Sequence, residues 1–157
     1  VIANKWIFDN FKDKKIGIIG GNNKIELIKK LFKHKEYKDY IGIDGFSDYI
    51  SVPEKFACDD IDGLEKEIGK KLENSTSDIF IFGIGISKLA LAHRFKKHKN
   101  AIYLDVGCGI SALAGTTSLE RPYFGDWTNF RINDYNYSEI DPIDYKDTKG
   151  INEIILY

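Results

Sequence analysis

The sequence predicts an α/β protein with a Rossmann-like, doubly wound and mostly parallel sheet that carries helices on both faces. Two features of the chain lead to this prediction. First, short runs that are apolar almost throughout recur along the chain, at 15–20, 78–82 and 100–105. Second, amphipathic segments with helical spacing lie between these runs. Continuously apolar strands that alternate with helices are typical of a parallel sheet covered on both faces, whereas a one-sided antiparallel sheet alternates polar and apolar residues.

The first strand is predicted at Lys15–Gly20, and Gly21–Asn23 then turns the chain. A helix should follow, because apolar residues recur there at intervals of three and four, namely Ile25, Ile28, Leu31 and Phe32. Asn23 and Glu26 have the spacing of a capping box, which would begin this helix. The segment therefore predicts a strand, a tight turn and a helix.

The middle of the chain predicts a second strand at Tyr40–Asp44 and a short extended piece at Tyr49–Val52, which ends at Pro53. Asp59 or Asp60 should cap the next helix. That helix has one apolar stripe and ends near 74–77; the stripe consists of Ile61, Leu64, Ile68 and Leu72.

The clearest unit comes next: a strand at Asp78–Phe82, a turn with Gly83 and Gly85, and a helix at Ile86–His98. Asn100–Asp105 is predicted as a further strand. From Gly107 onward the chain is rich in glycine, hydroxyl and aromatic residues without a clear period, and we expect a functional loop there. The last six residues are expected to form a strand or docking segment.

The 157 residues suit one Rossmann-like domain, with a core at about 11–125 and an acidic, aromatic tail at 126–157. The chain contains no methionine, not even at its first position. We therefore expect that it is a fragment that lacks N-terminal sequence.

Composition argues against several classes of function. With 23 basic and 24 acidic residues, the net charge of −1 gives no field that attracts nucleic acid. Two cysteines are too few for a disulfide framework, which indicates a reducing compartment. The sequence shows no signal-peptide pattern and no apolar run of membrane-spanning length, so a cytoplasmic location and no membrane span are expected. The histidines and the tail aspartates suggest no metal site; they are His34, His93, His98, Asp141, Asp144 and Asp147.

Two strand-to-helix turns contain glycines where phosphates often bind. The first turn has Gly20 and Gly21, and the second has Gly83 and Gly85, followed by Ser87 and Lys88. Glycine lets a phosphate approach the backbone, and the start of the following helix attracts an anion. Glycines also simply make tight turns, and this plainer explanation is weaker for the second turn than for the first.

The end of the next strand should contribute to the same site, because parallel strands present their carboxyl ends at one edge. Asp105 could hydrogen-bond ribose hydroxyls there, beside Gly107. Arg121 could contact phosphate, and Tyr123 could stack on a base or sugar. The alternatives are that Asp105 caps a helix and that Arg121 makes a surface ion pair.

The segment Leu104–Gly109 also resembles the glycine loop of S-adenosylmethionine methyltransferases, although that loop normally follows the first strand of its sheet. The order of motifs along the chain is similar instead to the GT-D-type glycosyltransferases. The segments that carry this resemblance are Phe11–Gly20, Val52–Ala57, Asp78–Gly85, Tyr103–Gly107 and Arg121–Tyr123.

The resemblance implies a glycosyltransferase that takes a nucleotide sugar, with a UDP-sugar first among the donors, and transfers the sugar to a glycan acceptor. It also implies Mn²⁺ or Mg²⁺ in the complete enzyme. Members of the family carry an upstream Arg-Phe-Gly-Asp-Gly-Glu-like segment that binds the metal, and no such segment occurs in this chain. No catalytic residue or metal ligand is therefore assigned. The alternative is a module that binds a nucleotide sugar or a protein partner without turnover.

Overall fold

The protein is built around a four-stranded sheet in which every strand is parallel to its neighbours, in the order β2-β1-β3-β4. This computed structural model describes residues 2, 4–116, 127, 130–133 and 135–137, together with the backbone of 154–156. The four strands are β1 (Ile16–Gly21), β2 (Asp48–Val52), β3 (Ile79–Gly83) and β4 (Ile102–Asp105). The sheet confirms the predicted Rossmann-like α/β fold.

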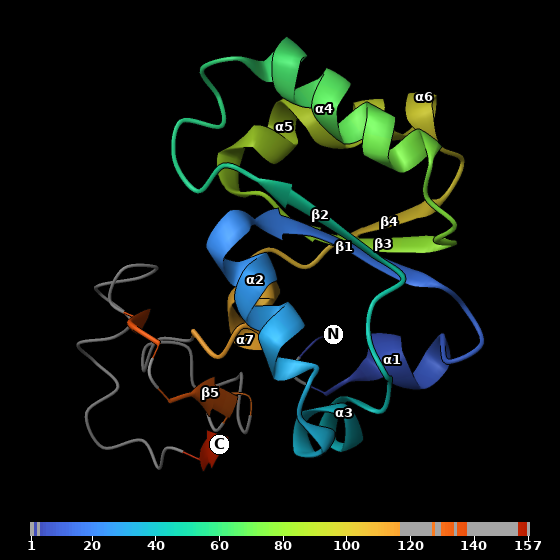
Figure 1. Cartoon of the computed structure of the whole chain (residues 1–157). Helices are drawn as coiled ribbons and strands as arrows, with labels where there is room; N and C mark the ends of the chain where they lie inside the picture. The colour runs from blue at the N-terminus through green and yellow to red at the C-terminus, as the bar shows by residue number, and fades with distance from the viewer. Residues whose placement is uncertain are drawn as a thin grey trace.

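Helices cover both faces of the sheet (Figure 1). One face carries α1 (Trp6–Asn10), α2 (Asn22–Leu31), α3 (Lys35–Ile41) and α7 (Gly109–Leu113). The other carries α4 (Ile61–Glu73), α5 (Lys88–Leu91) and α6 (Phe95–His98), with the 3₁₀ turns η1 (Gly85–Ser87) and η2 (Ala92–Arg94). The chain crosses from β1 to β2 in one direction and from β2 to β3 in the other. Right-handed connections in opposite directions place their helices on opposite faces.

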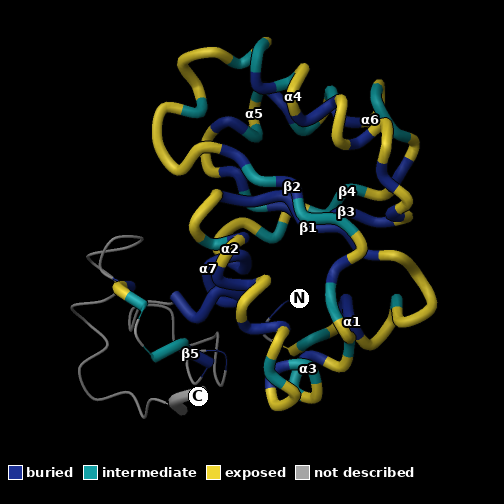
Figure 2. Tube along the Cα trace, in the orientation of Figure 1, coloured by how far each residue is buried: buried dark blue, intermediate teal, exposed yellow. Residues whose placement is uncertain are grey.

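Each face of the sheet has its own hydrophobic core (Figure 2). In β1, Ile18 packs among α1, α2 and α7, while its neighbour Ile19 packs under α4. In β3, Ile81 lies in the first core, and Phe80 and Phe82 lie in the second. These strands are apolar throughout because both of their faces are buried.

The predicted strand at Tyr40–Asp44 is wrong, because the chain forms α3 up to Ile41 and then turns. Tyr37 and Ile41 are four residues apart and both are buried, as expected for one face of a helix. Gly42 ends the helix in the left-handed conformation, with φ of 84°. The second strand along the chain is β2, which pairs with β1 and matches the extended piece expected at Tyr49–Val52.

The predicted helix at Ile86–His98 is wrong as a single helix, because it is broken into η1, α5, η2 and α6. Ile86 and Leu89 are exposed, so the first half of the segment lacks the packed apolar stripe that would stabilise a continuous helix. Asp60 does cap α4, since its carboxylate accepts a hydrogen bond of 2.8 Å from the Gly63 amide.

The segment after Gly107 also differs from the expected loop. It forms α7, whose five residues are all buried. Trp127 and Phe130, from the predicted tail, pack in the same core as α1 and α2. Phe130 begins β5 (Phe130–Ile132), which pairs in parallel with β6 (Ile154–Leu156) and so confirms a strand within the last six residues. In the described part of the chain, no helix has the length and apolar character needed to cross a membrane.

Candidate functional site

The carboxyl ends of the four strands meet at one edge of the sheet, and the turns that follow β3 and β4 touch there. A Cβ atom placed on Gly83 would lie 2.2 Å from the carbonyl oxygen of Gly107. Only glycine allows two backbones to approach so closely. The two glycine-rich turns that the sequence predicted to converge therefore do converge.

Two cavities open at this edge. They lie at the switch point of the sheet, where the connection from β1 runs to β2 on one side and the connection from β2 runs to β3 on the other side. Ligands of open parallel sheets bind at such switch points. The first cavity, of about 280 Å³, lies between residues 52–58 and 83–87. The second, of about 450 Å³, lies between residues 83–89 and 105–111. Both are lined by Lys24 and by residues 83–86, so they form one continuous trough, which we call the carboxyl-edge trough.

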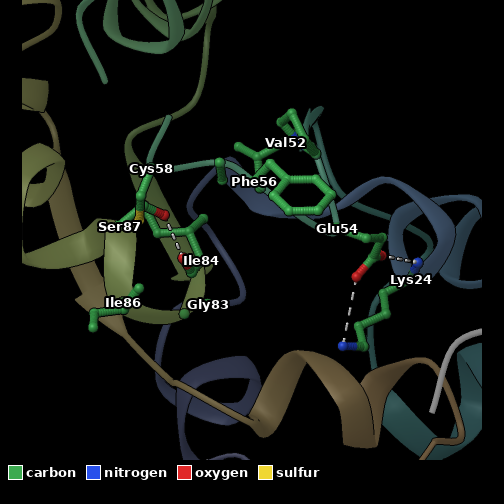
Figure 3. A pocket seen from close by; sticks show the side chains of 13 residues that line it. Lys24, Val52, Glu54, Phe56, Cys58, Gly83, Ile84, Ile86 and Ser87 are labelled. Atoms are coloured by element: carbon green, nitrogen blue, oxygen red, sulfur yellow. Dashed lines mark hydrogen bonds and ion pairs between the residues drawn. The ribbon is translucent and has the colours of Figure 1, made fainter. Parts of the chain in front are cut away.

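The first glycine turn is filled by groups of the protein itself. A Cβ on Gly20 would lie 2.8 Å from Ile110, and one on Gly21 would lie 2.3 Å from the Glu54 carboxylate. That carboxylate accepts a hydrogen bond of 3.0 Å from the Asn23 amide. It also lies 3.8 Å from Lys24 Nζ (Figure 3). An internal anion thus occupies the N-terminus of α2.

Glu54 also replaces the capping box that the sequence predicted at this helix. α2 begins at Asn22, one residue before the predicted cap, and no side chain of its first turn caps it. Glu26 pairs with Lys29 instead of with the helix start. The spacing of residues near the start of the helix could not identify Glu54 as its cap. Glu54 does lie within the Val52–Ala57 segment that carries part of the family resemblance.

The second glycine turn leaves its backbone open. Gly85 has φ of 59°, and among the described residues beyond its chain neighbours no atom lies within 4 Å of the place where its Cβ would be. Ser87 is buried, and its hydroxyl donates a hydrogen bond of 2.5 Å to the Ile84 carbonyl. The helix that follows, α5, has only four residues, so it contributes much less dipole than the continuous helix we expected.

Lys88 and Asp105 join the second turn to the end of β4. Lys88 Nζ lies 2.6 Å from Asp105 Oδ2, and Asp105 Oδ1 accepts a hydrogen bond of 2.9 Å from the Gly107 amide. The predicted residues that share the second cavity are Gly83, Gly85, Lys88, Asp105 and Gly107. Gly21, Gly83, Gly85 and Ser87 share the first cavity. Arg121 and Tyr123 lie outside the described residues.

Sequence reasoning did not foresee the apolar rim of the trough. Phe56, Ile86 and Leu89 line its cavities although their exposed fractions are 78%, 72% and 76%. Ile86 and Leu89 belong to the segment expected as one helix, in which apolar residues three apart would share a buried face. Phe56 lies in the Val52–Ala57 segment, to which the sequence assigned no role. Exposed apolar groups around a cavity are typical of a binding surface.

The described residues do not form a site for the divalent cation that the resemblance implies. They contain no group of three or more His, Cys, Asp or Glu residues that could hold a metal ion. The acidic residues that line the trough are Glu54 and Asp105, and each already pairs with a lysine. We therefore assign no step to a metal.

We compared the chain with protein-family models, with curated proteins and with solved structures, and none of the three comparisons gives a match. The resemblance to the GT-D-type glycosyltransferases thus stays a prediction from the sequence.

Proposed function

We propose that the carboxyl-edge trough binds a nucleotide sugar, and that the chain is a glycosyltransferase domain that transfers this sugar to a glycan acceptor. The observation that carries the proposal is the trough itself, which crosses the switch point between β1 and β3 and combines an open glycine backbone with lysines. Gly85 leaves room for a phosphate to approach its amide. Lys24 and Lys88 line the adjoining walls and supply positive charge.

The location of the family-like segments supports the choice of reaction. Phe11–Gly20 contains most of β1 and leads into the first glycine turn, and Val52–Ala57 forms a wall of the first cavity. Asp78–Gly85 ends at the wall that both cavities share, and Tyr103–Gly107 ends at the second cavity. Three segments that are far apart in the sequence thus line one trough, and the fourth ends one residue before Gly21, which lines the first cavity. The fifth, Arg121–Tyr123, lies outside the described residues.

Within this proposal, the protein binds and orients the donor. Phosphate oxygens compete with the two carboxylates for Lys24 and Lys88, whose partners in the free protein are Glu54 and Asp105. Asp105 then accepts hydrogen bonds at the end of β4 from hydroxyls of the transferred sugar, in place of the ribose hydroxyls expected from the sequence. The affinity for donor should fall as salt rises, because both lysine contacts are partly exposed.

Calorimetric titration of the chain with UDP, GDP and common nucleotide sugars tests the proposal, with and without Mn²⁺. We expect saturable binding of a nucleoside diphosphate, and UDP as the preferred one. Sugar transfer to a panel of glycan acceptors is then measured with the full-length protein. Failure of every nucleotide to bind to that protein would contradict the proposal.

A second candidate function is a module that binds the nucleotide sugar without turnover. In the free protein Glu54 and Asp105 each pair with a lysine and accept a hydrogen bond from a backbone amide, so both carboxylates in the described part of the trough have structural partners, and we assign neither as the catalytic base. Tight binding of a nucleotide sugar without transfer or hydrolysis by the full-length protein would favour the module. Binding of S-adenosylmethionine would instead favour the methyltransferase alternative.

A further inference from the structure

We infer that Phe56 is the platform on which the planar base of the nucleotide stacks. The trough would then hold the base against residues 52–58, the phosphates near Lys24 and Gly85, and the sugar near Asp105. This inference rests on the proposed function, because it assigns an orientation to the ligand within the same trough.

Phe56 carries the only aromatic ring among the described residues that line the two cavities. Each cavity also contains apolar side chains and an ion pair, which is Lys24–Glu54 in the first and Lys88–Asp105 in the second. Because the ring lies in the wall formed by residues 52–58, a base stacked on it leaves the middle of the trough, with Lys24 and Gly85, for the phosphates and the end with Asp105 for the sugar.

Phe56 differs from the other phenylalanines of the described chain. It belongs to neither hydrophobic core, and it is the only described phenylalanine that is largely exposed. Figure 3 shows its ring on the wall formed by residues 52–58, with Ile84 and Ile86 on the other side of the cavity. A base between these walls would contact the ring on one face and aliphatic side chains on the other.

The backbone of Phe56 adopts a conformation that a large residue rarely takes. Its φ is 60°, in the left-handed region where glycine is favoured. Its carbonyl accepts a hydrogen bond of 3.0 Å from the Asp59 amide, which closes a local turn that glycine would form more readily. Packing does not explain why a phenylalanine stands here. Strained residues cluster at ligand-binding sites, where the side chain has a role that offsets the strain.

The segment that carries Phe56 is anchored on both sides, so the ring is held at the rim. Two residues earlier, Glu54 binds the first amides of α2. Four residues later, Asp60 caps α4 through the Gly63 amide. A stacking residue on such a tethered turn loses less conformational freedom when the ligand binds than one on a free loop.

The test compares UMP with ribose 5-phosphate, which share a phosphate and a ribose and differ in the base. We expect the wild-type chain to bind UMP more tightly. Phe56→Ala should weaken UMP binding by roughly 5- to 100-fold, the range for loss of one base-stacking contact, and should change ribose 5-phosphate binding less than twofold. Phe56→Trp should keep the preference for UMP, because it keeps an aromatic face.

Two further variants separate stacking from folding. Phe56→Gly removes the ring but suits the positive φ, so its melting temperature should equal or exceed that of the wild type while UMP binding falls as in Phe56→Ala. Trp6→Ala removes another exposed aromatic ring, on α1 and outside the lining of the trough, and should leave both affinities unchanged.

Four results would overturn the inference. If wild-type protein binds UMP and ribose 5-phosphate equally well, or if Phe56→Ala keeps the wild-type affinity for UMP, nucleotide binding stands but Phe56 is not the platform. If Phe56→Ala weakens both ligands equally, the ring supports the wall of the cavity and does not contact the base. If neither UMP nor UDP binds to the wild type, the proposed function fails together with the inference.

Discussion

Gly85 and Gly42 share an unusual backbone conformation but lie in different parts of the molecule. Their φ values are 59° and 84°, and for both glycines the described residues other than their sequence neighbours leave the space within 4 Å of a Cβ position open. Gly85 lines the trough, whereas Gly42 ends α3. The two glycines therefore form a matched pair, in which the cost of backbone strain can be separated from the effect on a ligand.

We predict that Gly85→Val and Gly42→Val each lower the free energy of unfolding by about 1–2 kcal/mol, because a side chain is disfavoured at positive φ. Only Gly85→Val should also weaken UDP binding, by about tenfold or more, since its side chain would occupy the space through which a phosphate approaches. Chemical denaturation and calorimetry measure the two effects. Unchanged UDP affinity in Gly85→Val would remove Gly85 from the binding site.

Glu54 stabilises α2 from outside the helix. Glu54→Ala leaves the Asn23 and Lys24 amides without their carboxylate, and we predict a loss of about 1 kcal/mol in the free energy of unfolding. Glu26→Ala, which removes an exposed carboxylate paired with Lys29 in the same helix, should change that free energy by less than about 0.5 kcal/mol. Urea unfolding of both variants checks the difference, and equal losses would contradict a capping role for Glu54.

The positions of some of these residues could be predicted from the sequence, and those of others could not. Gly83, Gly85 and Gly107 follow apolar runs, and strand ends in a parallel sheet meet at one edge, so their convergence could be predicted. Glu54 could not be predicted as the cap, because it lies 31 residues from the amide that it binds and capping patterns only relate close neighbours. The exposed position of Phe56 likewise depends on the turn that holds it.

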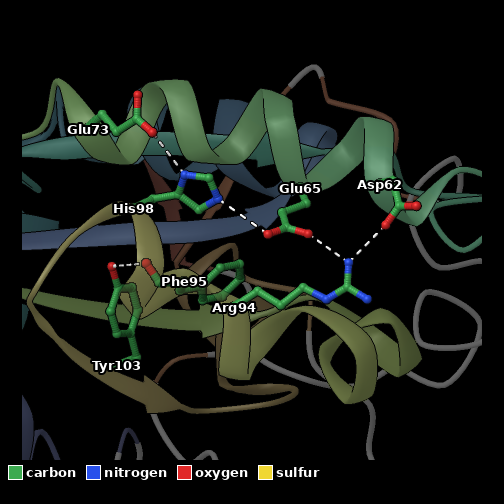
Figure 4. A network of polar contacts seen from close by, with 7 residues as sticks. All are labelled: Asp62, Glu65, Glu73, Arg94, Phe95, His98 and Tyr103. Atoms are coloured by element: carbon green, nitrogen blue, oxygen red, sulfur yellow. Dashed lines mark hydrogen bonds and ion pairs between the residues drawn. The ribbon is translucent and has the colours of Figure 1, made fainter.

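At the scale of elements, α4 is joined to the segment after β3 by a network of charged side chains (Figure 4). Arg94 binds Asp62 and Glu65 at 2.9 Å and 2.7 Å. His98 contacts Glu73 at 2.9 Å and Glu65 at 3.4 Å. Glu65 contacts both Arg94 and His98, so this network connects η2 and α6 to α4. It does so although the helix predicted at Ile86–His98 is broken.

The network should make stability depend on pH. The hydrogen bond from Arg94 lowers the pKa of Glu65 below its ordinary value, and His98 contributes less. A carboxyl whose pKa is lower in the folded state stabilises the fold above its unfolded pKa of about 4.3, and this contribution is lost as the pH falls through the folded pKa. We predict that Arg94→Gln destabilises the protein at pH 6 and has a smaller effect near pH 3.

Urea unfolding at the two pH values measures this change. Lys71→Gln is the control, because it removes the cation of an exposed pair with Glu67 on the same helix and should have little effect at either pH. An equal loss of stability at pH 6 and pH 3 in Arg94→Gln would show that the Glu65 carboxylate is not the group involved.

Which elements could be predicted depended on how fully they are buried. β1 and β3 are apolar on both faces, and that pattern identifies a central strand of a parallel sheet. The error at Tyr40–Asp44 arose because Tyr40 and Ile41 also suit a strand, while the burial of Tyr37 and Ile41 on one helical face depends on tertiary packing. The exposure of Ile86 and Leu89 was missed for the same reason. Their spacing alone predicts burial, whereas their actual exposure depends on tertiary packing.

At the scale of the whole molecule, Trp127 ties a late part of the chain to its beginning. Its ring lies 4.9 Å from Tyr40 and 6.4 Å from both Phe8 and Tyr37, measured between ring centroids. The side chain is completely buried. The alternation of strands and helices predicted the fold class, but it contained no signal that an aromatic residue at this position would complete a core with α1 and α3.

We predict that Trp127→Ala lowers the free energy of unfolding by about 3–5 kcal/mol, because it leaves a large cavity in this core. Trp127→Phe should cost less, since an aromatic ring remains and the indole nitrogen has no hydrogen-bond partner in the described part of the chain. Denaturation monitored by circular dichroism measures both variants. A loss below about 1 kcal/mol in Trp127→Ala would contradict a core role.

The unequal burial of the two tryptophans has a spectroscopic consequence. Trp6 is 47% exposed and Trp127 is fully buried, so their fluorescence should differ in emission wavelength and in accessibility to quenchers. In a Trp6→Phe variant, the remaining emission should be blue-shifted and resistant to acrylamide while the protein is folded. That single signal would then report when the aromatic cluster around Tyr37 and Tyr40 opens, independently of events at the trough.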